Sequence, residues 1–181
     1  DFQQATIKGV TGYFGMRTGV AVKNKTQWKD LSAPAGLFTD PIVWFSAAET
    51  SFLKAEAALH WPDEFGGEEG MKTAYEEGIR LSFAEKGVDG AESYMNDDTK
   101  KPVKFISKIQ TNHSINPVST LTIKWNEADN EERKLERIIT QKWIALYPNG
   151  AEAWSEYRRT GYPAQFPAID DYSCLLYTSD A

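Results

Sequence analysis

The chain has 181 residues, of which 41% are hydrophobic and 25% charged, so it can form a folded core and is not expected to be disordered. Its formal net charge is −6 and it has no basic stripe, which argues against nucleic-acid binding. The single cysteine, Cys174, excludes a disulfide framework or a cysteine-based metal site within the chain. His60 and His113 lack the spacing of metal ligands, so we expect no metal or other cofactor.

Residues 1–45 are the least helical part of the sequence. Several glycines stand among β-forming residues here, and this density predicts turns and short extended pieces rather than a long helix. We therefore expect 1–45 to be rich in loops.

A capping box marks the start of the first long helix. Ser46 and Glu49 have the spacing at which a hydroxyl and a carboxylate satisfy the free N–H groups of a helix start. Apolar positions then recur at helical spacing until Trp61 and Pro62, which disfavour continuation. Glu56 lies on or beside the apolar stripe, and we interpret it as a structural carboxylate that bonds to a neighbouring helix.

A second amphipathic helix is expected from about Glu68 to Lys86, with a short helix following at 89–96. In the longer of the two, from Glu68 to Lys86, apolar residues recur with the period of an α-helix. Because only a short polar link separates the two long helices, residues 46–96 are predicted to form an antiparallel helical hairpin.

Residues 97–127 show no sustained periodicity and are predicted to be irregular. A third long helix is expected from about Ala128 to Tyr147, where Pro148 stops it. Asn149 is placed to cap a shorter helix directly afterwards. The sequence therefore predicts a second helical hairpin at 128–163.

The second hairpin carries two tryptophans near its tight turn. Trp143 and Trp154 are predicted to close on each other as a dry internal seam between the two helices. Arg158 and Arg159 lie in the last helical turn, where the helix dipole favours cations. Glu156 and Arg159 have the spacing of an ion pair on a helix surface, and we expect one of the arginines to be buried against acidic groups elsewhere.

Three sequence blocks stand out together: FSAAETSFLKAEAAL at 45–59, YEEGIRLS at 75–82, and ITQKWIALYPNGAEAWSEYRRTGYP at 139–163. In this order and with this spacing, they resemble the SusD/RagB outer-membrane lipoproteins, specifically the SusD-like 2 branch. The resemblance covers residues 42–168 well and 1–41 loosely. The residues that we take as its structural signature are Glu56, Gln141, Lys142, Trp143, Trp154, Arg158 and Arg159.

The resemblance implies a mainly α fold of tetratricopeptide-like helical hairpins, with irregular loops and little strand. Residues 1–171 would be the C-terminal part of a longer SusD-like domain, and 172–181, which show no periodicity, would be a non-native or disordered tail. The full-length protein would be a lipid-anchored lipoprotein on the surface of a Bacteroidota outer membrane, with its anchor outside this fragment. Its partners would be a SusC-like TonB-dependent transporter and an oligosaccharide or other nutrient, and it would not be an enzyme.

A site for sugar binding would combine aromatic rings with polar groups on loops, because a pyranose ring has an apolar face that stacks on aromatics. Tyr13, Phe14, Arg17 and Trp28 lie in the loop-rich segment and are our candidates for ligand binding. The alternative is that they fill the core under the loops.

Two other functional classes stay open at this point. The chain could be a helical-repeat scaffold that binds only protein, since paired amphipathic helices are the basis of such scaffolds. It could also be a fragment of a hydrolase, although the sequence contains neither a Gly-x-Ser-x-Gly motif nor a P-loop.

Overall fold

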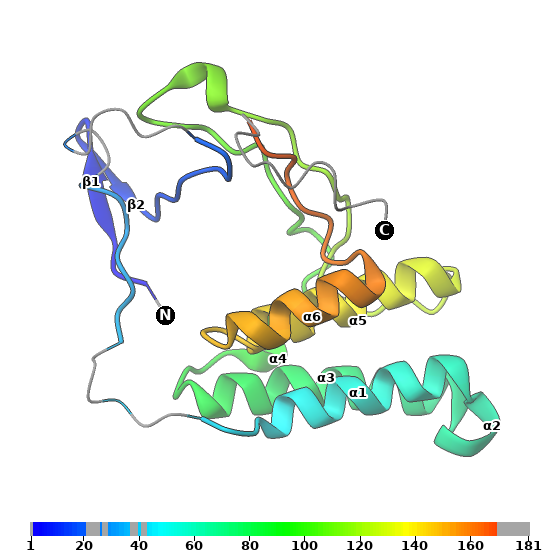
Figure 1. Cartoon of the computed structure of the whole chain (residues 1–181). Coiled ribbons are helices and arrows are strands. Elements are labelled where there is room, and N and C mark those ends of the chain that lie inside the picture. The colour runs from blue at the N-terminus through cyan, green and yellow to red at the C-terminus, as the bar shows by residue number, and fades with distance from the viewer. Residues whose placement is uncertain (1, 21–25, 27–28, 37–39, 41–42, 170–181) are drawn as a thin grey trace. The chain divides into compact units, whose positions relative to one another are not determined.

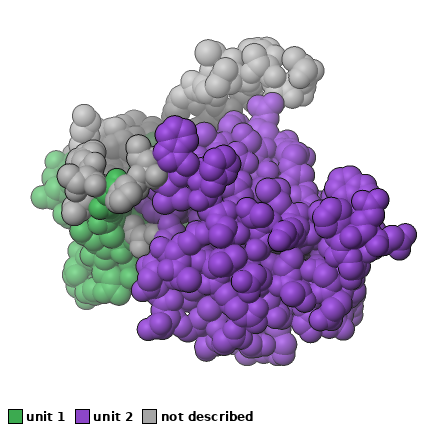
Figure 2. Space-filling view, turned by 90° about the horizontal axis from the view of Figure 1, so that it is seen from below, with its two compact units in different colours: residues 1–40, 103–118, 166–181 green, residues 41–102, 119–165 purple. Residues whose placement is uncertain are grey.

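The computed structural model describes residues 2–20, 26, 29–36, 40 and 43–169. The chain divides into two compact units, coloured green and purple in Figure 2. Unit 1 comprises Asp1–Asp40, Val103–Val118 and Phe166–Ala181, and unit 2 comprises Pro41–Pro102 and Ser119–Gln165. Within the described ranges, no helix is long and apolar enough to cross a membrane.

Unit 2 begins with an antiparallel pair of helices, α1 (Ala47–His60) and α3 (Gly67–Glu85), which lie side by side (Figure 1). The link between them contains one further turn of helix, α2 (Pro62–Phe65), with proline at a first-turn position where its missing N–H costs nothing. A short helix, α4 (Ala91–Met95), follows α3. The predicted first hairpin is present, and the ends of α1 and α3 lie within one residue of the expected positions.

The second pair of helices, α5 (Glu131–Ala145) and α6 (Gly150–Thr160), completes unit 2, and α5 packs on α1 (Figure 1). The start of α5 is three residues later than predicted because Asn130 supplies the cap, accepting the Arg133 N–H at 2.9 Å. The prediction of a mainly α fold of helical hairpins with little strand is confirmed.

The start of α1 is capped from two directions. The Ser46 hydroxyl oxygen accepts the Glu49 N–H at 3.3 Å, as the capping box predicted. In addition, Glu85 at the end of α3 accepts the Ala47 N–H at 2.8 Å and the Ser46 hydroxyl at 2.8 Å. A carboxylate from the second helix therefore satisfies the free N–H groups of the first and fixes the ends of the hairpin together.

The core of unit 2 is centred on Phe52 of α1 and Tyr75 of α3, both almost fully buried. Their rings meet edge to face, with centroids 6.2 Å apart. The Tyr75 hydroxyl donates to the Ile123 carbonyl at 2.6 Å, so the ring is buried without leaving its polar atom unpaired. Burial raises the pKa of Tyr75 far above its ordinary value.

The segment before α5 is held by buried charges. Arg137 of α5 donates to the Lys124 carbonyl at 2.7 Å and pairs with Asp129 at 2.5 Å. Lys134, one turn earlier, pairs with Glu68 of α3 at 2.6 Å. Glu68 also accepts the indole N–H of Trp125 at 2.8 Å, so the irregular segment is fixed to α5 through Arg137 and to α3 through Glu68.

The predicted tryptophan seam between α5 and α6 is wrong. Trp143 is 40% exposed and Trp154 is 58% exposed, so neither ring lies in a dry interior. Trp154 instead stacks on Tyr157 of its own helix, with centroids 5.6 Å apart, and Arg158 lies 5.9 Å from its ring. Both segments are nevertheless helical, so the hairpin exists without the packing that was expected to close it.

Charged side chains occupy the place of that seam. Lys142 of α5, almost fully buried, pairs with Glu156 of α6 at 3.1 Å. Arg159 forms a bidentate pair with Glu56 of α1 at 2.5 and 2.8 Å, and also contacts Glu156 at 2.7 Å. The structural role predicted for Glu56 and the pairing of Glu156 with Arg159 are both confirmed. The expected burial of an arginine is wrong: Arg159 reaches these carboxylates from the surface, and its side chain stays 48% exposed.

These pairs shift the ionisation of the groups involved. Hydrogen bonding to Glu56 raises the pKa of Arg159. Burial opposes the ionisation of Glu156, but Arg159 and Lys142 outweigh it and hold the pKa of Glu156 below its ordinary value. Gln141, also buried, accepts the Tyr94 hydroxyl at 3.1 Å, which adds a neutral link between α4 and α5.

Unit 1 contains a small antiparallel hairpin of β1 (Ala5–Ile7) and β2 (Val10–Gly12). Lys8 and Gly9 form its two-residue turn with φ of 51° and 77°, the left-handed geometry that matches the twist of hairpin strands. A 3-10 turn, η2 (Thr111–His113), lies in the second segment of the unit. The predicted tail at 172–181 falls outside the described residues.

Candidate functional site

A pocket of about 400 Å³ lies within unit 1. Four stretches of the chain form it: the segment directly after β2, Leu31, the segment that starts at Val103, and Phe166. A volume of this size is in the range of sites for small organic ligands, about 300–1,000 Å³. The lining residues are Tyr13, Phe14, Gly15, Leu31, Val103, Lys104, Phe105, Ile106, Ser107, Lys108, Ile109 and Phe166.

The first wall of the pocket follows directly after β2. The Phe14 N–H donates to the Ser32 hydroxyl at 2.9 Å, and the Ser32 N–H donates to the Phe14 carbonyl at 3.0 Å. These two bonds fix the backbone at Phe14. The neighbouring Tyr13 is 66% exposed, so its ring is accessible to a ligand from solvent.

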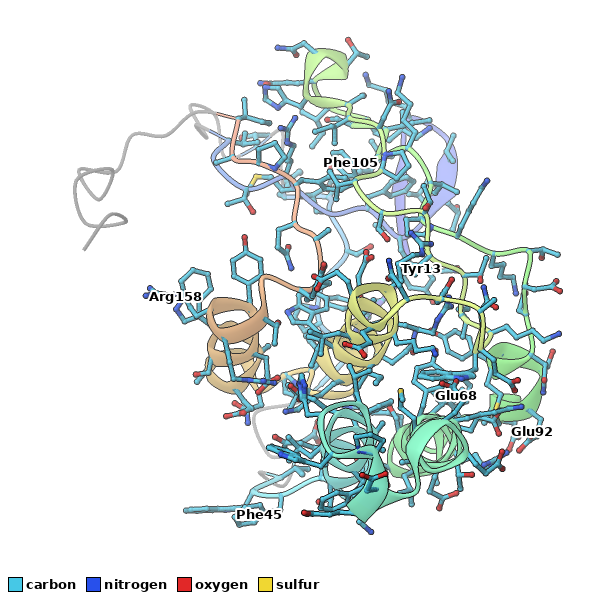
Figure 3. The ribbon with its side chains drawn as sticks, turned by 90° about the vertical axis from the view of Figure 1, so that its right-hand side faces the viewer. Tyr13, Phe45, Glu68, Glu92, Phe105 and Arg158 are labelled. Carbon is cyan, nitrogen blue, oxygen red and sulfur yellow. The ribbon has the colours of Figure 1, made fainter. Side chains whose placement is uncertain are left out.

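The opposite wall is centred on Phe105, labelled together with Tyr13 in Figure 3. Phe105 and Ile115 exchange backbone hydrogen bonds of 2.9 and 3.0 Å, an isolated antiparallel bridge that holds this segment extended. The Phe105 ring lies 6.2 Å from that of Phe166 at an angle of 45°. The two rings form an apolar corner of the pocket.

Arg17 holds the stretch that contains Phe166 in place. Its Nε and Nη2 donate to the Pro167 carbonyl at 3.1 and 2.8 Å. Two residues after Pro167, the Ile169 N–H donates to the Thr18 carbonyl at 3.1 Å. These bonds fix the segment that carries Phe166, so Arg17 supports the pocket through the backbone.

Two lysines give the pocket its charge. Lys104 and Lys108 line it, and neither forms an ion pair with any residue in the described part of the chain. Of the described lining residues, none is acidic. The pocket therefore combines aromatic walls with a positive charge that no group in the described part of the chain neutralises.

The structure brings together two of the four predicted ligand-binding residues. Tyr13 and Phe14 line the pocket, whereas Arg17 is not among its lining residues and Trp28 lies outside the described residues. The sequence prediction missed Phe105 and Phe166. The sequence offered little signal for them, because the alternation of Val103, Lys104 and Phe105 breaks at Ile106 and no pattern marks Phe166.

Unit 2 has exposed aromatic residues as well. Trp44 and Phe45, directly before α1, are 84% and 91% exposed, and Phe45 points away from the helices (Figure 3). Arg158, labelled in the same view, belongs to the exposed group formed with Trp154 and Tyr157 on α6. The described residues contain no group of three or more histidine, cysteine or acidic side chains that could hold a metal ion.

Helical hairpins and an aromatic pocket on loops define a mainly α protein whose candidate site lies outside its helices. The chain belongs to the SusD/RagB family: the SusD-like family model, described as "Susd and RagB outer membrane lipoprotein", matches residues 1–180. This confirms the resemblance seen in the three sequence blocks. The SusD-like 2 branch stays a prediction, because the matching description names SusD and RagB alone.

Several solved structures are similar to the chain. A SusD homologue from Bacteroides thetaiotaomicron is 41% identical with a TM-score of 0.84, and the match covers 93% of this chain and 35% of that one. A chitin-binding SusD homologue from Flavobacterium johnsoniae is 41% identical with a TM-score of 0.83, covering 95% and 35%. A SusD homologue from Bacteroides uniformis is 40% identical with a TM-score of 0.82, covering 92% and 34%.

The chain thus spans about a third of the length of these solved relatives. No curated protein matches it at a significant level.

Proposed function

We propose that this chain is part of a surface-exposed, lipid-anchored outer-membrane protein that captures a glycan or other nutrient for import. Its partner would be a SusC-like TonB-dependent transporter, to which the captured ligand passes. In this proposal the chain binds and does not catalyse. Unit 2 supplies a helical scaffold, and the aromatic pocket of unit 1 contributes to ligand capture.

One observation carries the proposal: the chain belongs to a family described as outer membrane lipoproteins, and a 41% identical relative is described as chitin-binding. The pocket adds a second, independent support. Tyr13, Phe14, Phe105 and Phe166 provide aromatic surface at an opening of the size that small ligands occupy.

The second candidate is a helical-repeat scaffold that binds protein without sugar. Trp44, Phe45 and Trp154 favour it, because large apolar side chains exposed to solvent are frequently found at protein interfaces.

Ligand titration with product analysis separates these functions. We expect an oligosaccharide to quench the tryptophan fluorescence of the full chain saturably, with no reducing sugar released. Co-purification with a protein partner but no response to any oligosaccharide would instead support the scaffold. Release of reducing sugar that disappears on mutating a single acidic residue would show a hydrolase and overturn the proposal.

The transporter partnership has its own test. A SusC-like transporter encoded beside this chain should co-purify with the tagged protein from outer membranes. Purification without any TonB-dependent transporter, under conditions where the glycan still binds, would contradict this part of the proposal alone.

A further inference from the structure

We propose that the pocket of unit 1 binds an anionic sugar, with its aromatic side chains against the sugar ring and Lys104 and Lys108 paired with the acidic group. The inference rests on the proposed glycan-binding function and adds the chemical class of the ligand. The shared chemistry is a pyranose ring that bears a carboxylate or a sulfate.

The aromatic walls match one part of such a ligand. Phe105 and Phe166 form a corner with their centroids 6.2 Å apart, and Tyr13 and Phe14 line the pocket from another segment. The C–H face of a pyranose ring is apolar enough to pack on aromatic rings, while its hydroxyl groups stay at the solvent side. Because the Tyr13 ring is largely exposed, a sugar can reach it without a rearrangement of the helices.

The lysines match the other part. Segment 103–118 contains two lysines and neither aspartate nor glutamate, although the chain as a whole has a net charge of −6. Most described cations of unit 2 are already paired, as Lys72, Lys134 and Lys142 are. Lys104 and Lys108 have no such partner in the described structure, so their charges are available to a ligand.

Neighbouring groups favour an anion over a neutral or cationic ligand. Apolar walls exclude water, and a charge beside them interacts more strongly with an opposite charge than it does in open solvent. No acidic residue is among the described lining residues, so a cationic ligand finds no counter-charge there. The acidic surface of the rest of the chain repels anions, which makes binding of an anion attributable to this local positive site.

Titration calorimetry on the full chain tests the inference with three oligosaccharides. An oligogalacturonide carries only carboxylates, a sulfated galactan oligosaccharide carries only sulfates, and a chito-oligosaccharide is neutral. We expect at least one anionic ligand to bind more tightly than the neutral one, with an affinity that falls as salt is added. The stronger of the two anionic ligands identifies whether the acidic group is a carboxylate or a sulfate.

Substitutions locate the binding. The double variant Lys104→Gln/Lys108→Gln should weaken the anionic ligand about tenfold, as expected for the loss of two exposed charge pairs, and leave the neutral ligand unchanged. Tyr13→Ala should weaken anionic binding at low and high salt alike, because it removes ring contact and no charge. Lys101→Gln, an exposed lysine that is not among the lining residues, is the matched control and should change nothing.

Two outcomes overturn the inference while the proposed function stands. One is a neutral oligosaccharide that binds as tightly as both anionic ones, with no effect of the double variant. The other is an equal loss of anionic binding in Lys101→Gln, which shows unspecific attraction. If no oligosaccharide of any kind binds the full chain, the inference and the proposed function both fail.

Discussion

At Gly78 of α3, the absence of a side chain allows the two helices of the first hairpin to approach. A Cβ at this position would lie 2.7 Å from Cε1 of the Phe52 ring. Because Phe52 is almost fully buried, its ring has no free space into which to move. The glycine is therefore required by packing and not by a turn.

This contact predicts the effect of Gly78→Ala. We expect the free energy of unfolding to fall by about 1–3 kcal/mol, the usual cost of adding volume to a packed core. Urea denaturation followed by circular dichroism measures it. The matched control is Gly150→Ala at the start of α6, where nothing lies within 4 Å of the added Cβ and alanine favours the helix by up to about 1 kcal/mol. Equal stability of the two variants would contradict the packing argument.

Single residues also show where prediction from the sequence fails. Lys142 is a long charged side chain and is nevertheless almost fully buried, because Glu156 arrives from another helix to neutralise it. Trp143, the adjacent aromatic, is half-exposed. A periodicity of 3.6 residues identifies a helix, but it does not tell which face a non-local partner will cover.

At the scale of elements, the helices were predictable because their start and stop signals are local. Ser46 and Asn149 cap their helices as expected, and Gly161 ends α6 in the left-handed conformation. The second cap of α1 was not predictable, since Glu85 comes from the far end of another helix. The pocket shows the same division: Tyr13 and Phe14 stood out by composition, whereas Phe105 and Phe166 reach it from distant segments.

Glu85 gives a prediction for the first hairpin. Its carboxylate lies in the last turn of α3, an unfavourable place for a negative charge, yet it accepts hydrogen bonds at the start of α1, where an anion is favoured. We expect Glu85→Gln to lower the free energy of unfolding by about 1 kcal/mol, the usual value of a helix cap. Thermal or urea denaturation measures the change.

Glu77→Gln in the same helix is the control for this substitution. Glu77 is half-exposed and lies 3.7 Å from Arg80, a surface pair of little expected value. A loss in Glu85→Gln no greater than in Glu77→Gln would show that the second cap contributes nothing. The double variant Glu85→Gln/Ser46→Ala tests whether the two caps act together. A total loss of unfolding free energy smaller than the sum of the two single losses would show that both side chains act on the same helix end.

At the scale of the whole molecule, charged side chains have different surroundings in the two units. In unit 2, ion pairs with one buried partner join helices that are distant in the sequence, as Glu56 and Arg159 do. In the pocket of unit 1, Lys104 and Lys108 have no partner among the residues that the structure describes. The first arrangement makes the fold dependent on pH, and the second leaves positive charge for a ligand.

The pH dependence follows from Glu156. Its pKa in the folded protein is below the ordinary value of 4.5, because Arg159 and Lys142 outweigh the effect of burial. A carboxyl with a depressed folded pKa contributes stability above its unfolded pKa and loses it as pH falls through the folded pKa. The contribution of Glu156 to the free energy of unfolding should therefore be nearly constant from pH 7 to about pH 5 and be lost below about pH 4.5.

Glu156→Gln isolates this contribution. At pH 7 it should lower the free energy of unfolding by about 2 kcal/mol, since Lys142 loses its nearest counter-charge while buried. Its stability should also depend less on pH below 4.5 than that of the unmodified chain. The stability of Glu156→Gln will still depend on pH to some extent, because Asp97 also has a depressed pKa. Hydrogen bonds from Thr99 and Lys100 to the Asp97 carboxylate cause it. Glu64→Gln, at an exposed position of α2, should keep the full pH dependence, and an unchanged slope in Glu156→Gln would refute the assignment.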